Sequence, residues 1–378
     1  MSVLLPLHGV RVLELCWVWS GPLLGQLLAD LGAEVIKVEW YKRFDLYRTR
    51  GVERLAGQVP EQLRREMSQS FHGLNRNKIG VTLDLKQVAH KDAFLDLVEV
   101  SDLVIENFTY GTIERLGIGY EVLSEINPSI VLLSLSAYGG ASRLAEMRSY
   151  GLALSSLSGL ENLIIDPKTE EFLGSPTFVS SDPNAASYGL EIALAGILDA
   201  RNLGHGSHIE MSQLEAAAHL AVDVNDHLQA IASSLGIVGD CHDDETRIVE
   251  TGDDQYLCVA SKNGLSAEAM DRICSLIPTL DAKNAILMCV KAGAYAVKVI
   301  EKPEEFGTGS TQQGTLLPSI HPITGSENIV AAPWRINNCR APLRKTAPTL
   351  GEGNSYVLTV ILNWNAEQCN SLKDPFLN

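Results

Sequence analysis

One short stretch of the chain concentrates the residues best suited to binding an anion. Residues 37–78 contain ten Lys or Arg against five Asp or Glu, although the whole chain has a formal net charge of -16. Clustered cations either form a solvated surface or bind an anionic ligand, such as a phosphorylated cofactor, through charge-assisted hydrogen bonds. Both interpretations stay open from the sequence. The overall negative charge argues against nucleic acid or an anionic membrane as a partner.

Cysteine and histidine, the usual metal ligands, predict no metal site here. The seven cysteines are scattered and form no CxxC pair, which is typical of reduced thiols in a cytoplasmic protein. His205 and His208 lie close together in GHGSHIEMS, but the glycines beside them favour a turn that enters a strand. No run of 18 apolar residues and no basic leader occur. We therefore expect a cytoplasmic protein without a metal or a membrane span.

The elements that position the basic stretch begin with the segment GVRVLELCWVWSGPLLGQLLADLGAEVIKVE, residues 9–39. An apolar run rich in β-branched residues precedes leucines at helical spacing, Gly32 ends the helix, and a second apolar run follows. This order predicts a βαβ unit with two parallel strands. A site is expected at their carboxyl ends, around residues 17–22 and 39–43.

Further along, apolar runs at residues 80–83, 103–107 and 130–135 alternate with segments of helical periodicity, which predicts a doubly wound α/β sheet. The clearest helix pattern starts at Asp182 with a cap and a proline and stops at Gly204. A shift in composition then predicts a smaller α+β domain. The expected boundaries are 1–231 for the first segment of the large domain, 232–320 for the small domain and 321–378 for a linker and return to the large domain.

A dinucleotide cofactor is the first function to weigh. Glu39 ends the second predicted strand, where a dinucleotide site places the acid that binds the ribose. However, SGPLLG supplies Gly21 and Gly25 without a GxGxxG motif, and Pro22 has no backbone N–H to donate. A nicotinamide dehydrogenase is therefore the weaker interpretation.

Five segments of the chain, taken in order, carry a likeness to a known family: residues 9–39, LNRNKIGVTLDLK, SDLVIENFTYGTIERLGIGYEVLSEINPSIVLLSLSAYG, GHGSHIEMSQLEA and APLRKTAPTLGEGNSYVL. With these segments the chain resembles the class III CoA-transferase family, which includes formyl-CoA transferase, carnitine CoA-transferase and 2-methylacyl-CoA racemase. The likeness covers roughly residues 5–225 and 333–358, whereas residues 235–330 match poorly. It implies a Rossmann-like large domain built from both ends of the chain, a small domain from the middle, and two subunits interlocked as rings.

The resemblance also implies that CoA lies along the first domain. It would place Trp40 beside the adenine, and Asn75 and Lys78 near the phosphates. Cations near this path would offset the acidity of the chain where the anionic cofactor binds. Carried over by position, the residues that would bind CoA are Val18, Trp19, Ser20, Trp40, Asn75, Lys78, Asn107, Phe108, Arg115 and Leu116.

The family's transfer chemistry uses an aspartate that attacks the thioester of an acyl-CoA, and this chemistry needs no metal. The resemblance places that aspartate in a loop after an SGL motif, here SGLENLIIDPKTEEFLGSP. An ungapped count from Ser158 places Lys168 there, with Asp166 two residues earlier and Glu170 two residues later. We expect Asp166 to be the nucleophile, with Glu170 as the alternative. An ordinary Asp-Pro turn is the competing interpretation of Asp166.

The function implied is the transfer of CoA from an acyl-CoA donor to a small carboxylic acid, by a homodimer or by a heterodimer with a paralogous subunit. The uncertain aspartate leaves an alternative open: a catalytically silent CoA-binding subunit of a heteromeric transferase, of the benzylsuccinate CoA-transferase type. An acyl-CoA racemase is less expected. The racemising branch uses a His-Asp pair, and this chain has Ser149, Tyr150 and Gly151 at that place, without the histidine base.

Overall fold

The computed structural model describes residues 5–163, 169, 171, 180–221, 246–261, 265–299 and 315–372. The chain divides into two compact units, Met1–Val222 with Leu316–Asn378, and Asp223–Thr315. The middle unit was expected at 232–320. Both carboxyl residues expected as the nucleophile, Asp166 and Glu170, lie outside the described residues.

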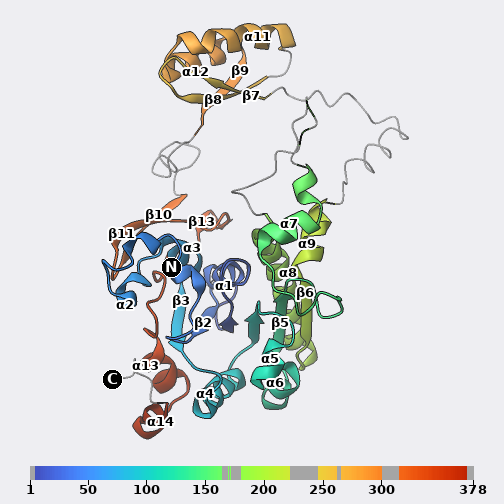
Figure 1. Cartoon of the computed structure of the whole chain (residues 1–378), viewed down its shortest axis with the longest axis vertical. Coiled ribbons are helices and arrows are strands. Elements are labelled where there is room, and N and C mark those ends of the chain that lie inside the picture. Colours follow the sequence, from blue (N-terminus) through green and yellow to red (C-terminus); the bar gives the residue numbers. More distant parts are fainter. Residues whose placement is uncertain are drawn as a thin grey trace, which may run out of the picture. The chain divides into compact units, whose positions relative to one another are not determined.

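A six-stranded parallel sheet forms the centre of the first unit (Figure 1). The strand order is β3-β2-β1-β4-β5-β6, and every neighbouring pair is parallel. The order reverses between β1 and β4, so the chain leaves these two strands toward opposite sides and a crevice opens at their carboxyl ends. The expected α/β fold with a parallel sheet is confirmed. The strands are β1 (Arg11–Leu15), β2 (Glu34–Glu39), β3 (Lys78–Thr82), β4 (Leu103–Glu106), β5 (Val131–Ser136) and β6 (His208–Ser212).

Helices cover both faces of this sheet, so its strands are apolar on both sides. On one face α1 (Ser20–Asp30) and α8 (Ser181–Leu203) bury leucines and alanines against β1, β4 and β5. On the other face α4 (Val88–Glu99) and α6 (Tyr120–Ile126) pack with residues near the carboxyl terminus. The two cores hold the strands in fixed register, which fixes the crevice at their ends.

The carboxyl-terminal segment returns to the edge strand β3. The Gly353 N–H donates to the Gly80 carbonyl at 2.8 Å, and the Asn354 side chain pairs with both the backbone and the hydroxyl of Thr82. Its elements, grouped with the first unit, are β10 (Leu316–His321), β11 (Gly325–Val330), β12 (Arg335–Ile336), β13 (Cys339–Arg340), α13 (Asn354–Tyr356), the π-helix η6 (Val357–Ile361) and α14 (Ala366–Ser371).

Short helices complete the first unit. They connect the strands or follow them at the carboxyl edge of the sheet. They are η1 (Leu46–Arg48), η2 (Glu53–Leu55), α2 (Glu61–Arg64), α3 (Gln69–Asn75), α5 (Thr112–Leu116), α7 (Gly151–Leu157), η3 (Leu160–Leu163) and α9 (Gln213–Ala221).

The second unit has an antiparallel sheet of its own, with the order β7-β8-β9. Two helices cover one face, and their apolar side chains form a separate core with Leu257 and Val259. Within the described residues of the chain, no helix is long and apolar enough to cross a membrane. The elements are β7 (Arg247–Glu250), β8 (Tyr256–Ser261), α11 (Ala267–Leu276), η4 (Ile277–Thr279), α12 (Ala282–Lys291) and β9 (Ala294–Lys298).

Candidate active site

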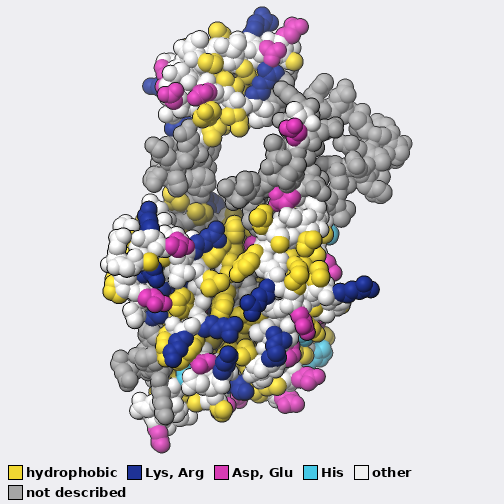
Figure 2. Space-filling model, in the orientation of Figure 1, with side chains coloured by type: hydrophobic (Ala, Val, Ile, Leu, Met, Phe, Trp, Pro, Cys, Tyr) yellow, Lys and Arg dark blue, Asp and Glu magenta, His cyan; other side chains and the backbone are white. Residues whose placement is uncertain are grey.

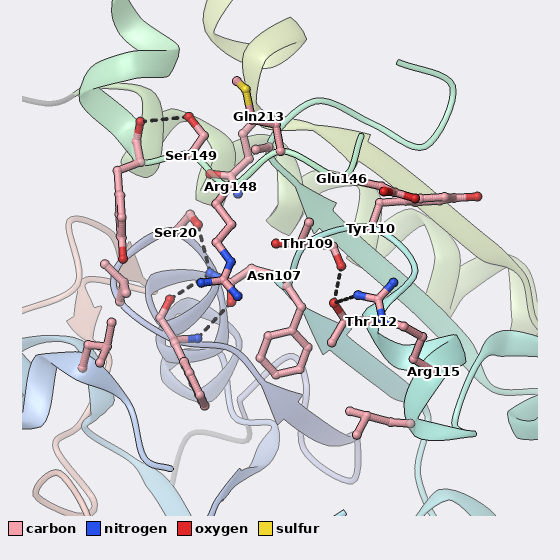
Figure 3. Close-up of a pocket in the computed structure, with 18 of the residues that line it drawn as sticks. Ser20, Asn107, Thr109, Tyr110, Thr112, Arg115, Glu146, Arg148, Ser149 and Gln213 are labelled. Atoms are coloured by element: carbon pink, nitrogen blue, oxygen red, sulfur yellow. Dashed lines mark hydrogen bonds between the residues drawn. The ribbon is translucent and has the colours of Figure 1, made fainter. Parts of the chain in front are cut away.

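A cavity of about 1050 Å³ lies at the carboxyl ends of β1 and β4, where the strand order reverses (Figure 3). The loop after β1 forms one wall, and the loop after β4 with α5 forms the facing wall. The segment that precedes α7, the start of α8 and residues that follow β2, β3, β5 and β6 also contribute to the lining. This is the place at which doubly wound sheets bind their ligands.

Asn107 joins the two walls across the crevice. Its side-chain oxygen accepts from the Trp17 N–H at 2.9 Å, and its side-chain nitrogen donates to the Trp17 carbonyl at 2.8 Å. The rings of Trp17 and Phe108 meet edge to face with centroids 5.7 Å apart. These contacts fix the loop after β1 against the loop after β4, so the two walls keep their positions relative to each other.

The glycines of SGPLLG serve packing. A Cβ on Gly21 would collide with the side chain of Cys16, and a Cβ on Gly25 would collide with the carboxylate of Glu14. Glycine at both positions lets α1 approach β1 closely. Close packing of α1 on β1 is therefore sufficient to explain glycine at both positions, and a pyrophosphate-binding role is not needed to account for them.

Asp182 lies in the first turn of α8 and lines the cavity. Burial raises the pKa of its carboxyl to about 6, against the lowering effects of a hydrogen bond from the Ser20 backbone and of the Arg50 charge. The start of α8 is fixed in place because the Ser181 hydroxyl donates to the Gly151 carbonyl at 2.9 Å. The cavity therefore contains a carboxyl group that is largely ionised at pH 7 and held by the protein.

Asp182 was not expected as a site residue. The sequence pattern predicted that Asp182 caps a helix, whereas the N-cap is Ser180. An acidic residue in the first turn of a helix is common, since it interacts favourably with the helix dipole. From the sequence, Asp182 could have been singled out only as an aspartate that follows the SGL segment and begins a long helix.

Six of the ten residues expected to bind CoA line the cavity: Val18, Ser20, Asn107, Phe108, Arg115 and Leu116. Trp19 and Trp40 are not among the residues that line the cavity, and their side chains pack elsewhere. Trp19 packs against a small cluster formed by Tyr47, Phe71 and Ala347. The Trp40 ring lies against Tyr41 and His90, with centroids 4.2 and 5.0 Å away.

Asn75 and Lys78, expected near the phosphates, lie in the protein interior. The Lys78 ammonium donates to Asn75 and to the Pro22 carbonyl, both at 2.8 Å, and lies 2.7 Å from a carboxylate oxygen of Glu14. Burial lowers the pKa of Lys78 to about 8, although Glu14 opposes this shift. Both side chains therefore stabilise the floor beneath the cavity and do not form part of its wall.

Most of the buried cations of the basic stretch are paired in the same way. Their partners come from β1, α1, β2 and the segments around η1 and α2, so their charges are balanced inside the protein. The pairs are Lys37 with Glu14 at 2.9 Å and Asp45 at 3.0 Å, Arg48 with Glu39 at 2.8 Å and Glu66 at 2.7 Å, and Arg76 with Asp30 at 2.5 Å.

Glu39, the residue weighed as a ribose-binding acid, is among these partners. Its carboxylate accepts two hydrogen bonds from Arg48, at 2.8 and 2.9 Å. Burial acts to raise its pKa, but the charge and hydrogen bonds of Arg48 lower it to about 2. Because the side chain is buried and fully engaged, it is not placed to bind a ribose hydroxyl.

A different set of cations lines the cavity. These side chains have no carboxylate partner among the described residues; Arg115 donates to the Thr112 hydroxyl at 2.9 Å, and Arg43 lies over the Trp17 ring. Two acids, Glu146 and Asp182, share the lining. Figure 2 shows Lys and Arg side chains gathered on this face of the first unit. The wall is therefore suited to an anionic ligand, and its cations are Arg43, Lys86, Lys91, Arg115 and Arg148.

No cluster of three or more His, Cys, Asp or Glu side chains that could hold a metal occurs within the part of the chain that the structure describes. The cavity lining contains hydroxyl, amide and cationic groups around Asp182. This donor set suits the recognition of a phosphorylated, partly apolar ligand beside a carboxylate.

The family model described as CoA-transferase family III matches residues 7–277. The chain belongs to this family. It is 28% identical over 276 residues to a succinate–glutarate CoA-transferase of Agrobacterium fabrum, covering 72% of this chain and 66% of the relative. It is 32% identical over 214 residues to an acetyl-CoA:oxalate CoA-transferase of Acetobacter aceti, covering 56% and 51%. The chain thus spans about half to two thirds of the length of these curated relatives.

Solved structures share the fold. A CaiB/BaiF family protein of Brucella suis superimposes with a TM-score of 0.76 at 21% identity, covering 93% of this chain and 98% of that one. A hypothetical protein of Mycobacterium tuberculosis gives a TM-score of 0.68 at 23% identity, covering 94% and 99%. At these identities the likeness concerns the fold alone.

Proposed function

We propose that this family III protein transfers CoA from an acyl-CoA to a small carboxylic acid, with Asp182 as the nucleophile. The observation that carries the proposal is the position of Asp182: a half-buried carboxyl in the wall of a cavity whose lining also contains five cations without a carboxylate partner among the described residues. Asp166 and Glu170, the residues expected from sequence, lie outside the described residues.

The chemistry needs only this carboxylate and the bound thioester. The Asp182 oxygen attacks the thioester carbonyl, the C–S bond breaks, and CoA leaves as a thiolate with a mixed anhydride on Asp182. The thiolate then attacks the aspartyl carbonyl, which releases the donor acid and leaves CoA as a thioester on Asp182. The acceptor carboxylate reverses the two steps and leaves with CoA. With a pKa of about 6, Asp182 is ionised at neutral pH yet more basic than an ordinary aspartate.

The cavity divides into two ends that suit the two parts of an acyl-CoA. In Figure 3, Arg148 extends into the cavity toward the side of Ser20 and Asn107, and Arg115 lies away from them beyond Thr112. We assign the phosphates to the end with Arg115, and the thioester to the end with Ser20 and Asp182. Guanidinium groups bind phosphate oxygens through paired N–H donors, which suits this assignment.

A transfer assay tests the proposal. The purified full chain is incubated with succinyl-CoA or acetyl-CoA and a panel of acids that includes succinate, glutarate and oxalate, since the relatives are named for these acids. We expect a new acyl-CoA with at least one pair, detected by mass spectrometry, and its loss in Asp182→Asn. Binding of CoA without transfer for any pair would contradict the proposal.

A second candidate function is a subunit of a heteromeric transferase. The observation in its favour is a relative named as the beta subunit of a succinyl-CoA–L-malate CoA-transferase of Chloroflexus aurantiacus, 32% identical over 213 residues and covering 56% of this chain and 50% of the relative. Mass measurement of the purified protein in solution separates a homodimer, our primary expectation, from a chain that pairs only with a paralogue. Racemisation has no support, because the described lining of the cavity includes no histidine.

A further inference from the structure

Arg148 differs from Arg115 in where its side chain points. It belongs to the segment between β5 and α7 and lines the cavity. In Figure 3 it extends into the cavity on the side of Ser20 and Asn107, away from Arg115. The guanidinium therefore presents its N–H donors to whatever occupies this end of the cavity.

No carboxylate in the described part of the chain neutralises Arg148. Two acids share the lining, Glu146 and Asp182, and neither forms an ion pair with the guanidinium among the described residues. The side chain also makes no hydrogen bond within this part of the chain. A guanidinium without a partner is available to a ligand, and its planar set of donors matches the two oxygens of a carboxylate.

The segment that carries Arg148 is anchored at both ends. After β5, the Ser136 hydroxyl accepts from the Gly139 N–H at 2.9 Å. A turn closes just before the arginine, where the Met147 N–H donates to the Leu144 carbonyl at 2.8 Å. At the far end, the first residue of α7 accepts a hydrogen bond from α8 at 2.9 Å. An arginine on a segment held in this way is partly pre-organised, which lowers the entropic cost of binding a ligand.

The chemistry of the cavity end decides what Arg148 would bind. Under the proposed function this end holds the thioester, so the acyl group and the acceptor acid occupy it in turn, while the CoA phosphates lie at the end with Arg115. We propose that Arg148 binds the second carboxylate of a dicarboxylic acid or of its CoA thioester, and so selects dicarboxylic over monocarboxylic substrates. The inference rests on the proposed function for the place of the thioester, and it holds whichever carboxylate is the nucleophile.

The selection follows from the cost of removing water from an unpaired charge. A monocarboxylic acid of the same length places a methyl group against the guanidinium, which then loses water and gains no partner. A site that supplies a donor for a polar group discriminates strongly against an analogue without that group. A hydrogen bond to a charged group changes an equilibrium constant by roughly 10- to 100-fold, which sets the size of the expected preference.

The first test measures binding alone and needs no turnover. Two unreactive thioethers, S-(3-carboxypropyl)-CoA and S-butyl-CoA, have chains of equal length that end in a carboxylate and in a methyl group. We expect the wild-type protein to bind the carboxypropyl form about tenfold more tightly or better in calorimetric titrations. Arg148→Gln should weaken binding of this form by a similar factor and binding of the butyl form less than twofold.

The losses in Arg148→Gln also show which part of the ligand the arginine contacts. Equal losses for the two thioethers would overturn the inference, because they would place the contact on the CoA portion. The absence of a preference in the wild-type protein would overturn it as well. If the wild-type protein bound neither thioether, the proposed function and the inference would both fail.

Arg143→Gln is the matched control for these titrations. Arg143 lies on the same segment, is exposed and is not among the residues that line the cavity. The variant loses the same charge and should keep both affinities of the wild-type protein. A loss for the carboxypropyl form equal to that in Arg148→Gln would contradict the assignment, because it would reflect the net charge of the segment.

The second test compares acceptor acids during turnover. With one acyl-CoA donor that the chain accepts, kcat/KM is measured for succinate and for butyrate. We expect a preference for succinate of about 30-fold or more, and a fall in this preference of about tenfold in Arg148→Gln, mainly through a higher KM for succinate. An unchanged preference in Arg148→Gln, while transfer continues, would overturn the inference alone. If no pair of acids is exchanged, the proposed function fails, and the titrations still decide whether Arg148 recognises the carboxylate.

Discussion

Two groups of cations in the first unit have the same chemistry and opposite surroundings. Beneath the cavity, Lys37, Arg48 and Lys78 each lie within 3.0 Å of a buried carboxylate oxygen. In the cavity wall, Arg115 and Arg148 have no carboxylate partner among the described residues. A charge buried without a partner destabilises the folded state, whereas a charge that faces a wet cavity does not. The cations of the first group are neutralised inside the protein and donate hydrogen bonds to backbone carbonyls. The cations of the second group remain available to bind an anion.

The largest expected effect is on Asp182, the carboxylate that shares the cavity lining with the second group. Asp182→Asn keeps the shape of the side chain and removes the nucleophile, so we expect transfer to fall by about 10³-fold or more with binding of CoA retained. Steady-state rates and calorimetric titration with CoA measure the two quantities. Asp199→Asn, on an exposed turn of the same helix, is the control and should remain active.

Removing a buried cation should affect folding. Lys37→Met leaves the carboxylates of Glu14 and Asp45 buried with one cation fewer, and we expect the free energy of unfolding to fall by about 3–5 kcal/mol. Arg148→Gln in the cavity wall should change it by less than about 0.5 kcal/mol. Denaturant titration measures both. Equal effects would abolish the distinction between the two groups.

Glu106 sharpens the comparison because it is a buried carboxyl that forms no ion pair among the described residues. Burial raises its pKa to about 7, against hydrogen bonds from Ser134 and the Phe108 N–H. Between about pH 4.5 and pH 7 the folded chain keeps a proton that the unfolded chain has released, so the free energy of unfolding falls as pH rises, by about 3 kcal/mol across the window. Glu106→Gln should remove this slope in melts recorded at several pH values, and an unchanged slope would contradict the assignment.

The smallest effect is expected for single cations of the wall. Arg115→Gln or Arg148→Gln removes one contact to an anionic ligand, which should raise KM for the acyl-CoA about tenfold and leave kcat nearly unchanged. The increase should shrink at high salt because screening already weakens the lost contact. Arg201→Gln is the control, since Arg201 pairs with Asp102, which precedes β4 at the end of the strand opposite to the cavity. A similar KM increase in this variant would contradict the assignment.

The sheet and the place of its crevice could be predicted from sequence because both follow from local patterns. Apolar β-branched runs specify strands, and leucines at helical spacing specify α1. The strand pattern predicted a site around residues 17–22 and 39–43, and Val18, Ser20 and Arg43 do line the cavity. Asn107 and Phe108, which follow β4 and also line it, were expected from the family resemblance alone.

The division of the cations could not be predicted from sequence, because it depends on contacts between distant segments. Arg76 pairs with Asp30, and Lys78 pairs with Glu14. The partners are far apart in the sequence, so a count of charges in one stretch cannot show which cations are paired. Asp182 was missed for a related reason. Its role follows from the packing of α8 against the loop after β1, whereas its local sequence only predicts the start of a helix.

The most direct test of the account is to locate the covalent intermediate. The protein is incubated with an acyl-CoA that it accepts, treated with borohydride to reduce an aspartyl thioester, and digested with trypsin for peptide mapping. Asp166 falls in the tryptic peptide 149–168, and Glu170 and Asp182 fall in the peptide 169–201, where fragment ions separate them. We predict reduction at Asp182 alone. Reduction at Asp166 or Glu170, or none during active turnover, would contradict the central claim.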